Sequence, residues 1–200
     1  MMRILAFSDL HLNAAAAANL VAQSNDVDLV LAAGDFCNAR HGLREALGLL
    51  DQMTCRVVAV PGNCESEAEL ASLAPPNWTV LHGASTQIDG LSICGLGYGV
   101  PETPFGSWSC DLSEDAADQM LSLVAHADIV VTHSPPKGIA DRTSTGLSVG
   151  SRAICDALAR LQPKLAVCGH VHDCWGEQGM IGNTPVYNLG PSGRIFEVVL

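Results

Sequence analysis

Five short apolar runs recur along the chain, and each has the pattern of a buried β-strand. They cover residues 3–8, 29–34, 56–62, 128–133 and 164–169, and each run is continuously apolar and partly β-branched. Strands that are buried on both faces of a parallel sheet have this composition. We therefore expect five strands of this kind.

The segments between these runs have apolar residues at helical spacing. They cover residues 13–24, 42–53, 65–74, 113–127 and 150–162. Alternation of strands and helices indicates an α/β fold. Residues 78–96 and 178–200 break the alternation with short strands joined by glycine turns, which predicts antiparallel additions to the sheets.

Composition indicates one well-packed domain over residues 1–200. The chain is 48% hydrophobic and 16% charged, and no stretch has the composition of a linker. No apolar run approaches the ~18 residues that a membrane span needs. The eight cysteines are scattered and include no C-x-x-C pair. They are typical of reduced packing residues in a cytoplasmic protein.

The net charge of −11 at pH 7 narrows the class of binding partner. Such a charge disfavours binding to a long nucleic acid, because that binding depends on many cationic contacts with phosphates. A small phosphate-ester substrate is compatible with it, since bound divalent ions make the field at one site positive. We expect no membrane partner, and the oligomeric state cannot be predicted.

Residues that can bind a hard or borderline cation end or directly follow every one of the five runs. Because the carboxyl ends of parallel strands share one edge of a sheet, we expect these side chains to converge there. A single Asp or His after a strand is more often a helix cap or turn former, so the expectation rests on the whole set. His41, His82 and His126 lack this placement. The set consists of Asp9, His11, Asp35, Asn63, His133, His170 and His172.

In order and context, these residues resemble the motifs of the calcineurin-like metallophosphoesterases. The matching motifs are Asp9-x-His11, Gly34–Asp35, Gly62–Asn63, His133 and Gly169–His170-x-His172. The stretches at 99–112 and 133–141 also resemble a small bacterial and archaeal branch of the family. The resemblance implies a four-layer αββα sandwich, in which helices flank two mixed β-sheets.

The resemblance also implies a dinuclear metal centre. One metal would be held by Asp9, His11, Asp35 and His172, and the other by Asp35, Asn63, His133 and His170, with Asp35 bridging. Carboxylate, amide and imidazole donors suit manganese first, with iron, nickel or zinc as alternatives. Two such ions can hold a bridging hydroxide for in-line attack on a phosphate ester, positioned through Asp35, Asn63 and His133.

The chain departs from the family pattern at Cys64, where many members have the histidine assigned to protonate the leaving oxygen. Cys64 is interpreted either as a small filler beside the site or as a reactive thiol. Arg40 and His41 follow Asp35 in a loop where either could contact a phosphate oxygen, or both could be solvated. The helix that starts near Ser151 could bind an anion, or Ser151 could simply cap it.

These features predict a metal-dependent phosphohydrolase. A phosphodiesterase is favoured over a phosphomonoesterase, on the branch resemblance alone. The alternative is a non-catalytic metal-binding scaffold that uses the same fold as an interaction surface. The complete ligand set favours the enzyme, whereas Cys64 in place of the histidine keeps the scaffold open.

Overall fold

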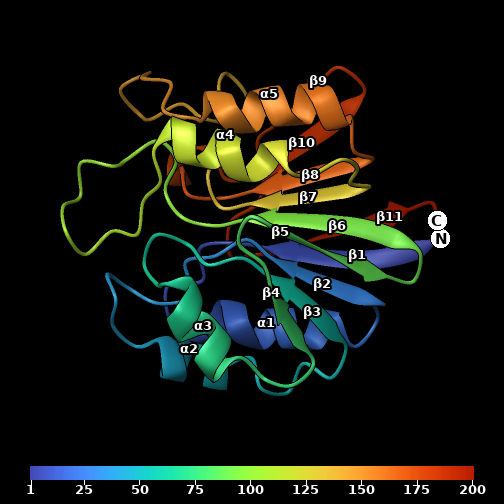
Figure 1. Ribbon diagram of the computed structural model, residues 1–200. Helices are drawn as coiled ribbons and strands as arrows, with labels where there is room; N and C mark the ends of the chain where they lie inside the picture. Colours follow the sequence, from blue (N-terminus) through green and yellow to red (C-terminus); the bar gives the residue numbers. More distant parts are fainter.

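Two β-sheets pack face to face between two layers of helices in the computed structural model, which describes residues 1–200 (Figure 1). The first sheet contains β1 (Met2–Phe7), β2 (Leu29–Ala32), β3 (Arg56–Ala59), β4 (Trp78–Val80) and β11 (Arg194–Val198) in the order β11-β1-β2-β3-β4. The second sheet contains β5 (Ala84–Ile88), β6 (Leu91–Leu96), β7 (Ile129–Thr132), β8 (Leu165–Cys168), β9 (Gln178–Ile181) and β10 (Thr184–Asn188) in the order β5-β6-β7-β8-β10-β9.

Helices cover the outer face of each sheet. The first sheet is covered by α1 (Ala14–Ser24), α2 (Leu43–Gly48) and α3 (Glu67–Leu73), and the second by α4 (Glu114–Ser122) and α5 (Arg152–Leu161) (Figure 1). This arrangement confirms the predicted αββα sandwich. None of the helices has the length and apolar character that crossing a bilayer would require.

The continuous apolar character of the five runs follows from burial on both faces. In β1, Leu5 and Phe7 pack in the cluster beneath helices α1–α3, whereas Ile4 and Ala6 pack in the cluster between the two sheets, which includes Val131 of β7. Successive side chains of a strand point to opposite faces, so both sets must be apolar. The observed strands end one to three residues earlier than predicted, because the last residues of each run already belong to the turns that carry the candidate ligands.

The predicted antiparallel additions are confirmed in part. β5 pairs antiparallel with β6, β9 with β10, and β11 with β1. The prediction is wrong for β4, which pairs parallel with β3 as the last strand of the first sheet. The stretch between β3 and β4 contains α3, so the chain crosses back to the end of the sheet where β3 begins before it enters β4.

Candidate metal centre

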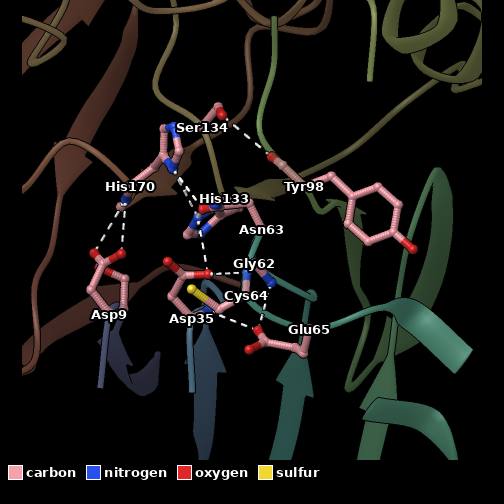
Figure 2. Close-up of polar contacts among 12 residues, drawn as sticks. Asp9, Asp35, Gly62, Asn63, Cys64, Glu65, Tyr98, His133, Ser134 and His170 are labelled. Carbon is pink, nitrogen blue, oxygen red and sulfur yellow. Dashed lines mark hydrogen bonds and ion pairs between the residues drawn. The ribbon is translucent and has the colours of Figure 1, made fainter. Parts of the chain in front are cut away.

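The candidate ligands lie on loops at one edge of the two sheets, where the strands end. Asp9 and His11 follow β1, Asp35 follows β2, Asn63 follows β3, His133 follows β7, and His170 and His172 follow β8. Figure 2 shows five of them, with Asp9 and Asp35 opposite His133 and His170. The two sheets are joined directly here, since the backbone N–H of His170 donates to Asp9 Oδ1 at 3.1 Å. The structure therefore brings together residues that are far apart in the chain.

Four of these residues form a first donor set. Their ligand atoms all lie within 4.8 Å of one another, and the set consists of Asp9, His11, Asp35 and His172. His11 Nε2 lies 3.2 Å from His172 Nε2 and 3.5 Å from Asp35 Oδ2. His172 Nε2 lies 3.7 Å from Asp9 Oδ1. This is the group of four that the family resemblance assigns to one metal.

A second donor set lies on the other side of Asp35. Asn63 Oδ1 is 3.1 Å from both His133 Nε2 and His170 Nδ1. His133 Nε2 is 3.5 Å from Asp35 Oδ1. Asp35 thus presents Oδ2 to the first set and Oδ1 to the second. A single carboxylate in this position can contact two cations.

Backbone carbonyl groups orient two of the imidazoles so that a free nitrogen faces the centre. His11 Nδ1 donates to the carbonyl oxygen of Cys37 at 3.0 Å, and His133 Nδ1 donates to that of Ala33 at 2.7 Å. In the neutral rings, Nε2 of each then carries the lone pair that faces Asp35. Metal-binding histidines are commonly held through their other ring nitrogen in this way. The donor set therefore fits divalent transition metals in both chemistry and orientation.

The backbone around the site adopts conformations that residues other than glycine rarely adopt. The φ angles are 52° at Asp9, 57° at Asp35 and 68° at His170. Non-glycine residues in this region cluster at functional sites, because the surrounding structure must compensate for the strain. Gly62 and Gly169, which precede Asn63 and His170 in the chain, have a steric role. A Cβ at Gly62 would lie 2.1 Å from Asp35 Oδ1, and one at Gly169 would lie 2.5 Å from Asp9 Oδ2.

The pKa shifts of the aspartates and histidines at the site indicate how the chain itself balances the buried charge. Burial alone would raise the pKa of Asp9, but pairing with His172 and the charge of His133 outweigh it and hold the pKa well below its usual range. Pairing with Asp9 raises the pKa of His172. Burial opposes charge on His133, yet Asp35 and Asp9 raise its pKa. Burial lowers the pKa of His170 to about 4, which leaves this ring neutral. Bound cations would replace the histidine protons as the compensating charge.

Cys64 lies beside the centre but packs into the core. It is 4% exposed and belongs to the apolar cluster beneath α1–α3, while its backbone N–H donates to Asp35 Oδ1 at 2.8 Å. Burial, together with the negative charge of Asp35, raises the pKa of the thiol. A protonated, buried thiol is a poor nucleophile. The structure therefore favours the interpretation of Cys64 as a filler.

Arg40 and His41 have different surroundings, although they are adjacent in the chain. The guanidinium group of Arg40 donates to Glu69 Oε2 at 2.6 Å and to Cys110 Sγ at 3.1 Å. Hydrogen bonding to Arg40 lowers the pKa of Glu69 to about 2. His41 is exposed, and its imidazole makes no hydrogen bond. The contact between Arg40 and a phosphate stays a prediction, and it would have to compete with Glu69.

The start of α5 already holds an anion from within the chain. Ser151 is the N-cap, as one of the two interpretations predicted, and its hydroxyl accepts from the N–H of Ile154. Glu114 of α4 fills the remaining positions, because its carboxylate accepts from the backbone N–H groups of Arg152 at 2.8 Å and Ala153 at 2.9 Å. An external anion is therefore not expected at this helix start.

Sequence reasoning missed Glu65, which fixes the loops that carry Asp35 and Asn63. Its buried carboxylate accepts from the backbone N–H groups of Gly62 at 2.7 Å and Asp35 at 2.8 Å (Figure 2). Burial raises the pKa of Glu65 to about 7. Its place two residues after Asn63 was the only signal in the sequence.

Two further residues that sequence reasoning missed hold Asp9. The hydroxyl of Ser8 donates to Asp9 Oδ2 at 2.5 Å, and Trp175 Nε1 donates to the same oxygen at 3.0 Å. Asp9 Oδ1 faces His172 and also accepts from the N–H of His170. No spacing in the sequence links Trp175 to Asp9, because the two residues come from different sheets.

Ser109 and Asp111 determine which way the amide group of Asn63 points. Ser109 Oγ lies 2.8 Å from Asp111 Oδ1 and 2.9 Å from Asn63 Nδ2. Since a carboxylate only accepts, the Ser109 hydroxyl donates to Asp111 and is left to accept from the Asn63 amide nitrogen. Asn63 Oδ1 must then face His133 and His170. This contact is a reason for Asn63 to act as an oxygen donor to a metal.

Replacing Ser109 with alanine is expected to weaken metal binding without unfolding the protein. The substitution removes the acceptor that orients the Asn63 amide, and loss of such an outer partner typically costs ~10–100-fold in metal affinity. Calorimetric titration of the metal-free protein with Mn²⁺ would measure the change. Ser107→Ala is the matched control, because Ser107 is exposed on the same loop and its hydroxyl makes no hydrogen bond. Equal affinities in the two variants would contradict the role assigned to Ser109.

Comparisons with known proteins identify the family of this chain. The family model of the calcineurin-like phosphoesterases matches residues 2–174. UPF0046 protein T07D4.2 of Caenorhabditis elegans is 25% identical, and the match covers 74% of this chain. The chain spans about half the length of that relative, since the match covers 47% of it.

Two solved structures share the fold. TT1561 of Thermus thermophilus has a TM-score of 0.76 at 18% identity, covering 96% of this chain and 90% of the other. A dimetal phosphatase from Danio rerio has a TM-score of 0.63 at 14% identity, covering 95% of this chain and 88% of the other. At these identities the likeness shows the fold alone. The matched family region, however, spans most of the chain and every candidate ligand. The chain therefore belongs to the calcineurin-like phosphoesterases.

Proposed function

We propose that this chain is a phosphodiesterase that depends on two divalent ions bridged by Asp35. The observation that carries the proposal is the Asp35 carboxylate, with Oδ2 at 3.5 Å from His11 Nε2 and Oδ1 at 3.5 Å from His133 Nε2. Family membership supports hydrolysis of a phosphate ester. A dinuclear centre is also consistent with the description of the Danio rerio protein as a dimetal phosphatase.

The chain's part in the reaction is to hold charge and geometry in place. Two divalent ions, once bound, supply a nucleophile from water near neutral pH and neutralise charge on the phosphoryl oxygens. Asp9 and Asp35 provide the anionic ligands, and His133 is fully buried, so its imidazole cannot reorient freely. Rigid ligands of this kind fix the position of the phosphate relative to the attacking group. Manganese suits the donors first, with iron, nickel or zinc as alternatives.

Charge at the site favours a diester over a monoester. A diester carries one negative charge on the phosphate, whereas a monoester carries nearly two near neutral pH. A cationic side chain beside the ions would favour the additional charge, but the guanidinium group of Arg40 is already paired with Glu69 at 2.6 Å. A cleft of about 690 Å³ beside His170 and His172 has room for a second ester substituent.

We further propose that the substrate is a small molecule and that the protein acts in a reducing compartment such as the cytoplasm. The net charge of −11 opposes binding to long nucleic acids. All eight cysteines are free. Reduced thiols are typical of proteins in the cytoplasm.

Metal reconstitution followed by an assay with chromogenic esters tests the proposal. Elemental analysis under saturating Mn²⁺ should approach about two equivalents per chain, the content of a two-metal site. Hydrolysis of bis(p-nitrophenyl) phosphate should exceed that of p-nitrophenyl phosphate, and a chelator should abolish both. No bound metal under saturating Mn²⁺ would refute the proposal.

The burial of Cys64 supports one other function, a metal-binding scaffold without catalysis. Cys64 occupies the position of the histidine that the resemblance assigns to donate a proton, and its thiol is buried beside Asp35 with a raised pKa. Two equivalents of metal combined with no turnover of any ester would favour the scaffold.

A further inference from the structure

A cleft of about 690 Å³ adjoins the candidate metal centre. It is lined by residues 101–105 of one loop and by Thr143 and residues 147–150 of another, together with His170 and His172. Both loops lie at the edge of the sheets where the strands end, the first after β6 and the second before α5 (Figure 1). The volume is that of sites that bind ligands much larger than a phosphate group. Something other than the phosphate is expected to fill it.

An aromatic surface lines this cleft. The ring of Phe105 is stacked on that of Trp108, with centroids 5.6 Å apart and an interplanar angle of 12°. Trp108 in turn packs against the core cluster beneath α1–α3. The stacking fixes one face of the Phe105 ring, while the side chain remains 50% exposed in the cleft wall. A rigid, exposed ring is well suited to stack on another ring.

An aliphatic side chain completes the apolar part of the cleft. Leu147, in the other loop, is 63% exposed. Its loop is fixed to the turn that carries His172, because the N–H of Ser144 donates to Asp173 Oδ2 at 2.7 Å. Exposed apolar side chains that line a concave site mark a ligand-binding surface more often than isolated ones do.

Charged side chains of both signs line the cleft. Lys137 and Arg152 line it, in a chain with only ten Lys and Arg residues. Three acidic residues also line it, but two of them are engaged with backbone N–H groups: Glu114 with the start of α5, and Asp173 with Ser144. The third, Glu102, has a carboxylate without a hydrogen-bond partner.

We infer that this cleft binds the organic group of the substrate and that this group carries an aromatic ring, which stacks on Phe105 and contacts Leu147. The inference rests on the proposed function, because the metal centre supplies the site for the phosphate at one end of the cleft. The ligand class is a phosphate ester with an aromatic ring. The ring can be a nucleobase one sugar away from the phosphate or an aryl group attached directly.

Two matched pairs of ligands test the inference and separate these sources. Adenosine 5′-monophosphate and ribose 5-phosphate differ only in the nucleobase, and phenylphosphonate and methylphosphonate differ in the directly attached ring. Calorimetry with the Mn²⁺-loaded protein would give the affinity ratio within each pair. We expect the ligand with a ring to bind about tenfold tighter in one pair, the size of a single stacking contact.

Substitutions at Phe105 show whether the ring preference belongs to this cleft. Phe105→Ala should reduce the affinity ratio between the ligands of a pair to about one, because only the ligand with a ring loses a contact. Phe105→Tyr should keep the preference, because tyrosine retains a ring that can stack. Leu123→Ala is the control, because Leu123 is an exposed apolar residue that does not line the cleft. A preference that survives Phe105→Ala, or equal binding within both pairs, would overturn the inference and leave the proposed function standing. Failure of all four ligands to bind at saturating Mn²⁺, in a protein that also fails to hydrolyse bis(p-nitrophenyl) phosphate, would refute both.

Discussion

Replacing Asp35 with asparagine is expected to weaken metal binding at both donor sets together and to abolish hydrolysis. Asp35 is the only residue with an oxygen facing each set. Its Oδ1 also accepts from the N–H of Cys64 at 2.8 Å, so the single oxygen of asparagine would stay there. The new NH₂ group would then point at His11 and its metal. The loss of affinity should exceed the ~10–100-fold that is typical for an outer-shell partner.

His172→Ala is the matched comparison for Asp35→Asn. His172 belongs to the first donor set only, and its side chain is partly exposed, so its removal should disturb one metal and leave the core intact. Titration with Mn²⁺ should show one weakened class of site in His172→Ala and two in Asp35→Asn. The bridging role of Asp35 would be wrong if Asp35→Asn retained two equivalents of metal and full activity.

Thermal unfolding of the metal-free proteins separates loss of ligation from loss of folding. Asp35 lies close to the buried carboxylate of Glu65, and its negative charge contributes to the raised pKa of Glu65. Removing that charge relieves repulsion in the metal-free state. Loss of the pairing between Asp35 and His133 opposes this relief, so the metal-free Asp35→Asn protein should unfold at a temperature close to that of the wild type.

Burial on both faces leaves a distinct composition in each central strand, so the strand pattern was sufficient to predict an α/β fold, whereas the four layers were implied by the family resemblance. The strands β1 and β2 are almost entirely apolar, with Arg3 as the one exposed position. Strand direction was harder to predict. β4 has only three residues, and nothing in Trp78–Val80 distinguishes a parallel partner from an antiparallel one. Its direction depends on where the chain emerges from α3.

The candidate site could be predicted from the chain as far as it depends on strand ends. Asp35 and His133 each follow a recognisable buried run, so their convergence follows from the topology. Partners that meet through tertiary packing left no such pattern. Arg40 pairs with Glu69 of α3, and Ser109 reaches Asn63 from a loop that precedes α4. Whether Cys64 faces the site or the core also depends on packing that a single sequence does not encode locally.

The rate of hydrolysis is expected to depend steeply on the leaving group. No imidazole outside the two donor sets is placed to protonate a leaving oxygen. Cys64 is 4% exposed in the core, with a thiol pKa raised by burial, and the exposed imidazole of His41 makes no hydrogen bond to the site. General acid catalysis is typically worth ~10²–10⁴-fold, and most when the leaving oxygen is basic. Nitrophenyl diesters should therefore react faster than alkyl diesters by at least this factor.

A series of aryl and alkyl diesters at matched Mn²⁺ loading would measure this dependence as the slope of log kcat/KM against leaving-group pKa. Cys64→Ala and His41→Ala should leave the slope unchanged, because neither side chain donates the proton. A histidine at position 64 is a less direct test, since overpacking a core position costs ~1–3 kcal/mol. A wild-type slope near zero would show that some group does protonate the leaving oxygen. If the slope then became steep in His41→Ala alone, the donor would be His41, and its loop would have to close over the metal centre during the reaction.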